Sequence, residues 1–194
     1  MLFLLRETPD IEFYEALIKF YRDNYRVSSS VILHNLRGIG GYESKLYSKL
    51  KNQIIPKIKT NDIKVFCCYD TDVFDLAKKP PINWKTVQSH VRSLNINTFN
   101  QVKSVKMIED WFLKDKAWLC RYLKINEPKK IDGKTGYIKI KNLFKKGNKI
   151  YQKGSSSHKF IQELDIDLIR RQIQGEIQEL ENALGLKPLV VSKK

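Results

Sequence analysis

An apolar run that ends in two aspartates constrains this chain more than any other feature. Residues 64–75 read KVFCCYDTDVFD, and the stretch up to Tyr69 has the composition of a buried β-strand. Because side chains alternate along a strand, we expect Asp70 and Asp72 on one face at its carboxyl end. Two carboxylates this close repel unless a cation compensates them, and Mg²⁺ is usually held by one or two carboxylates. The pattern indicates either a divalent cation site or a turn in which Asp bonds its own backbone.

Short apolar strands alternate with amphipathic helices along the chain, which is typical of an α/β fold with a mostly parallel sheet. The expected strands are residues 2–5, 29–36, 63–69 and 96–102. The expected helices are residues 11–25, a segment 42–55 that ends before Pro56, a segment from Asn83 or Thr86 through Val91, and residues 105–123 and 164–184. We predict one domain, with an α/β core in residues 1–123 that residues 124–194 complete.

The last expected helix carries one apolar stripe, with spacings of three and four residues. Its members are Ile166, Ile169, Ile173, Ile177, Leu180 and Leu184. Such a stripe either docks on the sheet or pairs with a second copy in a homodimer, and docking is favoured. A glycine segment, Gly38 to Gly41, follows the second strand and opens a helix. Free backbone N–H groups there suit a phosphate, but the segment matches no nucleotide-binding motif, so a tight turn that needs positive φ is favoured.

The chain is strongly basic and the excess is concentrated in one segment. Lys and Arg number 36 against 21 Asp and Glu, a formal net charge of +15, which is typical of a protein that meets a polyanion. Residues 124–153 hold ten lysines and two acids, and we expect a loop-rich basic surface with Tyr137, Phe144 and Tyr151 interleaved. Nucleic-acid contact is favoured over a merely solvated lysine face. The expected contacts are Lys129, Lys130, Lys134, Lys139, Lys141, Lys145, Lys146 and Lys149.

Membrane and secretory roles are not expected. The lysines do not follow one face of an apolar helix, and the opening MLFLL is too short for a signal peptide and lacks its basic leader. Cys67, Cys68 and Cys120 show no zinc spacing and are expected to be reduced core thiols, which indicates a cytoplasmic protein.

Two further acids extend the Asp70–Asp72 pattern. The first strand is followed by Glu7, and the segment SVKMIEDWFLKD places Glu109 at the start of a helix. Because strand ends and helix starts gather at the carboxyl edge of such a sheet, Glu109 is expected near Asp70. A cluster of this kind is what metal-dependent phosphoryl transfer requires, although each acid alone is more often a solvated surface residue.

In combination these motifs resemble the Toprim domain of topoisomerases, bacterial primases and nucleases of the overcoming-lysogenization-defect (OLD) type. The order is strand–Glu–helix, then an apolar strand with Asp-x-Asp, and residues 104–113 are similar to a segment of small Toprim-like phage-defence and abortive-infection proteins. The resemblance covers roughly residues 1–120, with a weaker likeness to about 165. The chain has Arg6-Glu7-Thr8-Pro9 where the family usually has Glu-Gly, so Asp10 and Glu12 are alternatives to Glu7.

The resemblance implies a Toprim-like (Rossmann-like) fold and a Mg²⁺- or Mn²⁺-dependent nuclease that cuts DNA or RNA in phage defence or on a mobile element. It implies that Asp70, Asp72 and Glu109 are metal ligands and that Glu7 and Lys153 are catalytic, with Lys153 in the place of the lysine that OLD-type nucleases carry after the core. The ATPase half of OLD proteins has no counterpart here, so ATP dependence would need a separate partner. The alternative is a non-catalytic nucleic-acid-binding or interaction protein on the same fold.

Overall fold

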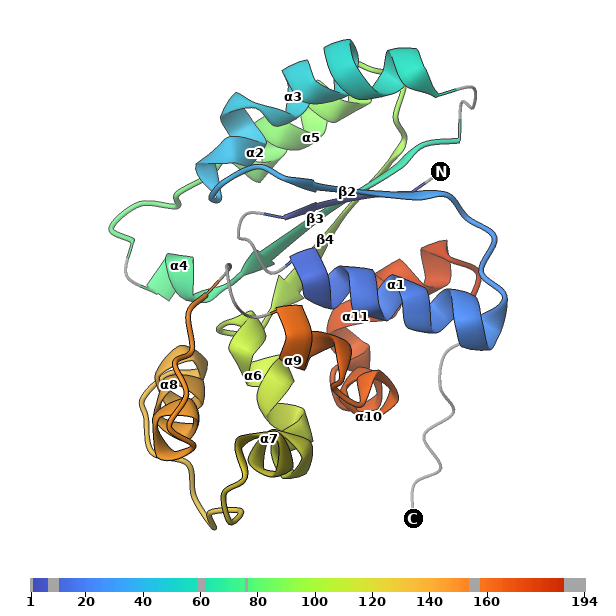
Figure 1. Ribbon diagram of the computed structural model, residues 1–194. Helices are drawn as coiled ribbons and strands as arrows, with labels where there is room; N and C mark the ends of the chain where they lie inside the picture. Colours follow the sequence, from blue (N-terminus) through green and yellow to red (C-terminus); the bar gives the residue numbers. More distant parts are fainter. Residues whose placement is uncertain (1, 7–10, 59–61, 76, 154–157, 187–194) are drawn as a thin grey trace.

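The computed structural model describes residues 2–6, 11–58, 62–75, 77–153 and 158–186, with the backbone alone for residues 2–6, 158 and 159. Four parallel strands form its sheet in the order β2-β1-β3-β4 (Figure 1). The strands are β1 (Leu2–Arg6), β2 (Val31–Asn35), β3 (Lys64–Asp70) and β4 (Thr98–Ser104). The prediction of an α/β fold with a parallel sheet is therefore confirmed.

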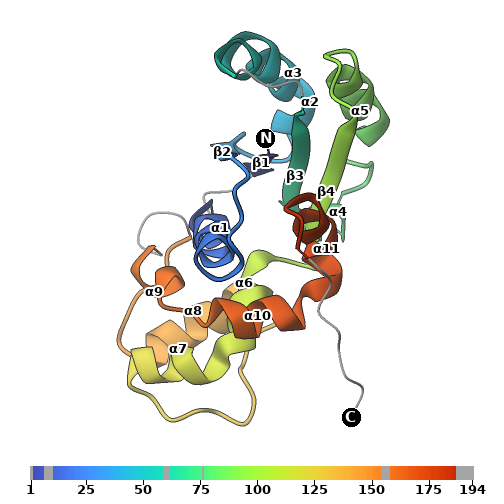
Figure 2. The ribbon, with the colours of Figure 1, turned by 90° about the vertical axis from the view of Figure 1, so that its right-hand side faces the viewer.

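Helices cover both faces of the sheet, and each face has its own core (Figure 2). Alternate residues of β3 serve the two cores, since Val65, Cys67 and Tyr69 pack on one side and Phe66 and Cys68 on the other. The first side is covered by α2 (Gly40–Ser44), α3 (Leu46–Lys49) and α5 (Trp84–Arg92). All three cysteines are buried free thiols, as expected.

The larger core lies on the other side of the sheet. It joins apolar residues of the first 123 positions with residues from the basic segment and the C-terminal helices. The helices that contribute are α1 (Ile11–Tyr25), α6 (Ile108–Phe112), α7 (Lys116–Leu123), α8 (Gly136–Lys146), α9 (His158–Gln162), α10 (Ile166–Gln172) and α11 (Gln174–Ala183). In the described part of the chain, no helix is long and apolar enough to cross a membrane.

Three expected helices are interrupted. After α2 and α3, the segment 42–55 continues as a π-helical turn (η1, Leu50–Ile54) and a 3₁₀ turn (η2, Ile55–Lys57) that contains Pro56. Proline has no N–H to donate, so the regular ladder cannot continue there. The segment 105–123 starts only at Ile108 and is divided by a 3₁₀ turn (η3, Leu113–Asp115), after which the Asp115 carboxylate caps α7.

The C-terminal segment bends at Ile173, which separates α10 from α11. The six residues of its apolar stripe are nevertheless all buried in the larger core. Docking of the stripe within the same chain is thus observed, and the alternative of pairing with a second copy is not needed to cover it.

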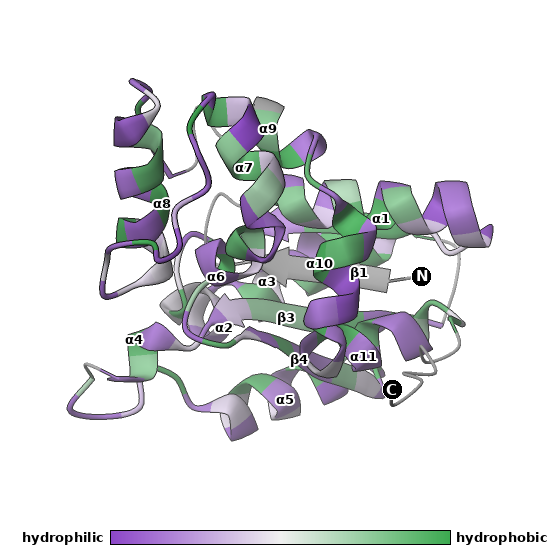
Figure 3. Ribbon diagram, turned by 90° about the horizontal axis from the view of Figure 1, so that it is seen from below, coloured by the Kyte–Doolittle hydropathy of each residue, from purple (hydrophilic) through white to green (hydrophobic). Residues whose placement is uncertain are grey.

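The basic segment is loop-rich, as expected, but one helix, α8, forms its centre. Thr135 caps the helix by accepting a hydrogen bond from the Ile138 N–H at 3.3 Å. Ile140, Leu143 and Phe144 then fall on one buried face, while the lysines occupy the other. Figure 3 shows the hydrophilic side of α8 turned away from α6 and α7. The sequence analysis did not predict α8, because the many lysines and glycines obscured its short apolar stripe.

The glycine segment forms a tight turn, in agreement with the favoured prediction. Gly38 has a φ of +97°, a conformation that L residues rarely adopt. Gly41 lies so close to the preceding strand that an added Cβ would stand 2.3 Å from the Leu36 carbonyl oxygen.

Candidate active site at the carboxyl edge of the sheet

The loops that leave β3 and β4 are tied to one another. Asp70 and Ser104 are register partners at the ends of these strands. The Thr71 N–H donates to the Ser104 carbonyl at 3.1 Å, and the Asp72 N–H donates to the Lys106 carbonyl at 2.9 Å. The Lys106 N–H in turn donates to Thr71 Oγ1 at 2.8 Å. These bonds therefore fix the backbone of the two loops next to Asp70 and Asp72.

Asp70 is buried, with 3% of its surface exposed. Its Oδ1 accepts a hydrogen bond from the Ile108 N–H at 3.0 Å, at the start of α6. Its Oδ2 lies 3.3 Å from Lys153 Nζ. Asp70 thus anchors the first turn of α6 with one oxygen and faces a lysine with the other.

Glu109 is fully buried at 0% exposure and approaches the same lysine. Its Oε2 lies 3.5 Å from Lys153 Nζ, and its Oε1 accepts a hydrogen bond from the Tyr151 hydroxyl at 3.1 Å. The structure therefore brings together Asp70, Glu109 and Lys153, three of the residues that the sequence singled out.

Asp72 reaches the site by a different route from the one expected. The strand ends at Asp70, and Asp72 is the first residue of a short helix, α4 (Asp72–Asp75), so strand alternation does not place it. Its carboxylate is still close enough to interact with the others. Partial burial and then the charge of Asp70 raise the pKa of Asp72, while Lys153 opposes this shift.

A further carboxylate, Asp110, borders the same edge. Burial raises its pKa, Lys139 and Lys114 oppose the rise, and Asp70 adds to it. The first turn of α8 packs directly on this residue, because a Cβ added to Gly136 would lie 2.8 Å from Asp110 Cγ. Asp72 and Asp110 line one cavity of about 340 Å³, together with Lys106, Lys134 and Lys139. The basic segment therefore reaches the acidic site through Lys134 and Lys139.

The fit of a divalent cation can be judged from the donors. Among the described residues, no group of three or more His, Cys, Asp or Glu side chains is arranged to hold a metal ion. Asp70 Oδ2 and Glu109 Oε2 nevertheless face one point, at which the Lys153 ammonium supplies the positive charge. Carboxylate oxygens are the donors that Mg²⁺ and Mn²⁺ take, so the two acids suit a hard cation at or beside that point.

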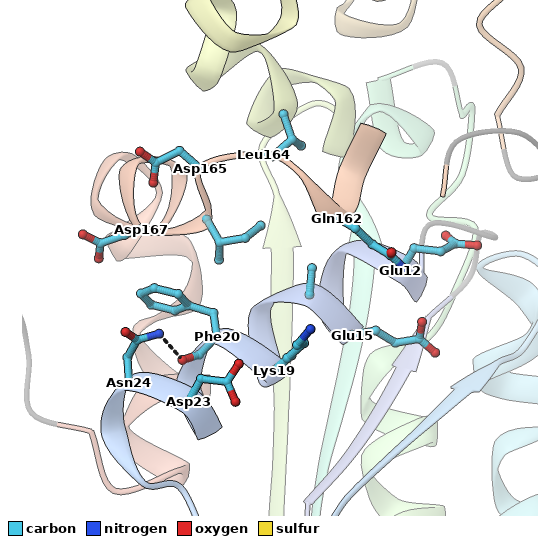
Figure 4. Close-up of a pocket in the computed structure, with 12 residues that line it drawn as sticks. Glu12, Glu15, Lys19, Phe20, Asp23, Asn24, Gln162, Leu164, Asp165 and Asp167 are labelled. Carbon is cyan, nitrogen blue, oxygen red and sulfur yellow. Dashed lines mark hydrogen bonds between the residues drawn. The ribbon is translucent and has the colours of Figure 1, made fainter. Parts of the chain in front are cut away.

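The structure does not join the acid expected after the first strand, Glu7 or its alternatives Asp10 and Glu12, to this cluster. Glu7 and Asp10 lie outside the described residues. Glu12, the other alternative, is buried in the first turn of α1 and lines a separate cavity of about 450 Å³ between α1 and the α9–α10 region (Figure 4).

That second cavity is lined by several acids, but two of them, Asp165 and Asp167, already bind groups of the same helix, α10. Asp165 caps α10 by accepting from the Leu168 N–H at 2.9 Å. Asp167 pairs with Arg171 and lies 3.6 Å from Arg170. We assign no chemistry to this cavity.

The eight lysines expected to contact nucleic acid fall into different environments. Lys129, Lys130, Lys134, Lys141 and Lys145 are exposed, and Lys139 is partly buried. Lys146 lies 3.7 Å from Asp132, and Lys149 Nζ lies 3.7 Å from the centre of the Tyr122 ring.

The interleaved aromatic surface that the sequence suggested does not form. Phe144 and Tyr151 are buried in the larger core, with their ring centres 5.3 Å apart, and Tyr137 is half-buried against Tyr151. The apolar face of α8 draws these rings inward.

Sequence reasoning missed three contributors. Tyr151 was assigned to the surface, although it contacts Glu109. Ser104 is fully buried at the end of β4, and its hydroxyl has no hydrogen-bond partner within the described part of the chain. Glu176 accepts from the Val105 N–H at 2.7 Å and from Trp111 Nε1 at 2.9 Å, and so fixes the loop before α6. No local signal marks them, because each acts across more than forty positions or across two strands.

The fold and the site together define a parallel α/β protein with a lysine-bridged carboxylate pair at the carboxyl edge of its sheet. No family model, curated protein or solved structure matches the chain.

Proposed function

We propose that the chain is a Mg²⁺- or Mn²⁺-dependent nuclease with a Toprim-like arrangement of its site. The observation that carries the proposal is the convergence of Asp70 Oδ2 and Glu109 Oε2 on Lys153 Nζ, at the sheet edge where α/β enzymes place their ligands. The formal charge of +15 favours a polyanionic substrate. DNA and RNA both satisfy this requirement.

In this proposal Asp70, Asp72 and Glu109 would hold one or two cations. A bound cation would activate water and neutralise the scissile phosphate. The raised pKa of Asp72 is consistent with a group that gains from a cation nearby. Lys153 would face the charge that builds up on the phosphate, and Tyr151 would hold Glu109 in position through its hydroxyl. Phage defence or a mobile element is the setting that the resemblance favours, with an ATPase supplied by a separate partner if one is used.

A nuclease assay tests this proposal directly. Labelled single- and double-stranded DNA and RNA would be incubated with the full chain and Mg²⁺ or Mn²⁺, beside Asp70→Asn, Glu109→Gln and the control Glu179→Gln, an exposed carboxylate on α11. We expect metal-dependent cleavage that falls by about a hundredfold or more in the first two variants. Cleavage that persists in Asp70→Asn, or is absent from wild type on every substrate, contradicts the proposal.

One observation favours the alternative of a non-catalytic nucleic-acid-binding protein. The Lys153 ammonium already compensates the two buried carboxylates, as a structural ion pair would. Thermal denaturation with Mn²⁺ separates the two functions. A metal-dependent stabilisation that Asp70→Ala removes supports the nuclease, whereas salt-sensitive binding that is indifferent to metal supports the binding protein.

A further inference from the structure

A third cavity, of about 570 Å³, adjoins the cavity beside Asp72 and is lined mainly by lysines. Lys114 and Lys116 come from the junction of η3 and α7, Lys129 and Lys130 from the loop before α8, and Lys139 from α8 itself. We call this the lysine groove. Asp110 is the one carboxylate among the described residues that line it.

Among the described residues, the five lysines of the groove face only two carboxylates, Asp110 and Glu127, so the groove keeps a net positive charge. Lys116 pairs with Glu127 Oε1 at 2.7 Å. Within the described part of the chain, no ion pair involves Lys114, Lys129, Lys130 or Lys139. Ammonium groups that converge on one cavity repel one another, so an anion that enters the groove is favoured.

The groove adjoins the cavity that Asp72 borders. Lys139 and Asp110 line both cavities. The first turn of α8 packs against Asp110, a residue that both linings contain. In Figure 1, α4, α6 and α8 lie toward the same end of the sheet. A chain with regularly spaced phosphates can therefore occupy the groove and the cavity beside Asp72 at once, whereas a single phosphate cannot.

The lining also indicates which part of a nucleic acid it contacts. Beside the lysines and Asp110, it contains Leu113, Ile131 and Gly133, and no aromatic side chain from the described residues. Base stacking uses aromatic platforms, and base-edge reading uses Arg, Lys, Asn or Gln side chains that are held in fixed geometry, whereas Lys129 and Lys130 are exposed. Lysine is a point charge that suits phosphate without selecting a base.

We propose that the lysine groove binds the phosphate backbone of a nucleic-acid strand, without base selection, and delivers its next phosphodiester to the cavity beside Asp72. This inference rests on the proposed function, since it names how that site receives its substrate. It also separates the lysines of the basic segment into those that line the groove and those that do not. Lys146 and Lys149, at the far end of α8, are engaged by Asp132 and Tyr122, so they contribute only to the general field.

Two double variants with the same loss of charge test the inference. Lys129→Ala/Lys130→Ala removes two exposed groove lysines, and Lys145→Ala/Lys146→Ala removes the adjacent pair at the end of α8. Binding would be followed by fluorescence anisotropy with a labelled single strand of roughly 20 nucleotides, in EDTA to prevent cleavage, over a range of salt concentrations. A mixed sequence and oligothymidine would be compared.

For the groove variant we expect a Kd about tenfold higher and a salt slope lower by about 0.7 for each phosphate that is no longer neutralised, with less than about a twofold change in the other variant. The two sequences should bind with equal affinity. An equal loss of affinity in both variants, or a clear base preference, overturns the groove.

Cleavage assays separate this inference from the proposed function. Groove-dependent binding without any cleavage by wild type refutes the nuclease and keeps the groove. Metal-dependent cleavage combined with equal losses of affinity in the two variants supports the nuclease and refutes the groove. Absence of binding by wild type overturns the groove, and absence of both binding and cleavage overturns both proposals.

Discussion

Lys153 Nζ lies 3.3 Å from Asp70 Oδ2, although 83 positions separate the two residues in the sequence. The pair joins the end of β3 to the chain that follows α8, and Glu109 shares the same ammonium group. Asp70 and Glu109 are almost fully removed from solvent, so a shared ammonium group contributes strongly to stabilising their charges.

We expect Lys153→Met to destabilise the protein by about 2–4 kcal/mol near neutral pH, because it leaves two buried carboxylates without their shared cation. Urea denaturation measures the change, with the exposed helix residue Lys141→Met as control. Under the nuclease proposal, Mn²⁺ should stabilise Lys153→Met more than wild type, since the ion can take the place of the ammonium group. Equal urea midpoints for Lys153→Met and wild type would show that the contacts of Lys153 with Asp70 and Glu109 contribute nothing to stability.

Strong local patterns were predictable from the sequence. The bounds of α1 match the expectation, and β3 and the cap of α5 lie where the strand pattern and Asn83 indicated. Periodicity over many residues carries this information, and it survives in any packing arrangement.

The features that the sequence did not predict depend on contacts between distant segments of the chain. Asp72 begins a helix because β3 ends at Asp70 and the N–H groups of Thr71 and Asp72 then bond to the loop that follows β4. The sequence Asp-Thr-Asp alone does not reveal these bonds. Tyr151 turns inward because the face of α8 that holds Phe144 is buried. The proximity of Glu109 to Asp70 followed from sheet-edge reasoning, but the bridging position of Lys153 followed only from resemblance.

Asp72→Asn should raise stability at neutral pH in metal-free buffer. The pKa of Asp72 is raised above its ordinary value of 3.8, so the native state binds this proton more tightly than the unfolded chain does. The contribution of Asp72 to the free energy of unfolding therefore falls as pH rises from the ordinary pKa to the raised pKa of the folded state, and it stays low at higher pH. Melting temperatures should show the advantage of Asp72→Asn at pH 7 and its disappearance below the ordinary pKa.

Metal provides the second readout for Asp72. If its carboxylate binds the cation, Asp72→Asn should lose the Mn²⁺-dependent rise in melting temperature that wild type shows. Glu179→Gln, an exposed carboxylate on α11, should keep it. A full metal response in Asp72→Asn would remove this residue from the ligand set.

Tyr151→Phe isolates one hydrogen bond at the site. The change keeps the ring in its cluster and removes the hydroxyl that lies 3.1 Å from Glu109 Oε1. We expect a loss of about 1–3 kcal/mol, because a buried carboxylate loses a donor. Urea unfolding should show a lower midpoint with an unchanged slope. Tyr137→Phe, which alters a neighbouring half-buried ring, should have a smaller effect; equal effects would argue against a special role for the Tyr151 hydroxyl.

Adjacent glycines offer a matched test of the turn between β2 and α2. A Cβ at position 41 would stand 2.3 Å from the Leu36 carbonyl oxygen, and backbone cannot give way as a flexible side chain can. A Cβ at position 40 would meet nothing within 4 Å. The hydroxyl of Tyr42, the next residue, donates to the Cys68 carbonyl and so joins α2 to β3. Displacement at Gly41 is therefore transmitted to the strand that carries Asp70.

We expect Gly41→Ala to cost about 2 kcal/mol or more and to lower the melting temperature clearly. Gly40→Ala should be neutral or stabilising by up to about 1 kcal/mol, because alanine favours the helix and restricts the unfolded chain. Oligonucleotide affinity measured on the same proteins adds a second criterion. If the glycines only form a turn, Gly40→Ala binds as wild type does, whereas a marked loss of affinity in this stable variant would restore the phosphate-binding interpretation of the segment.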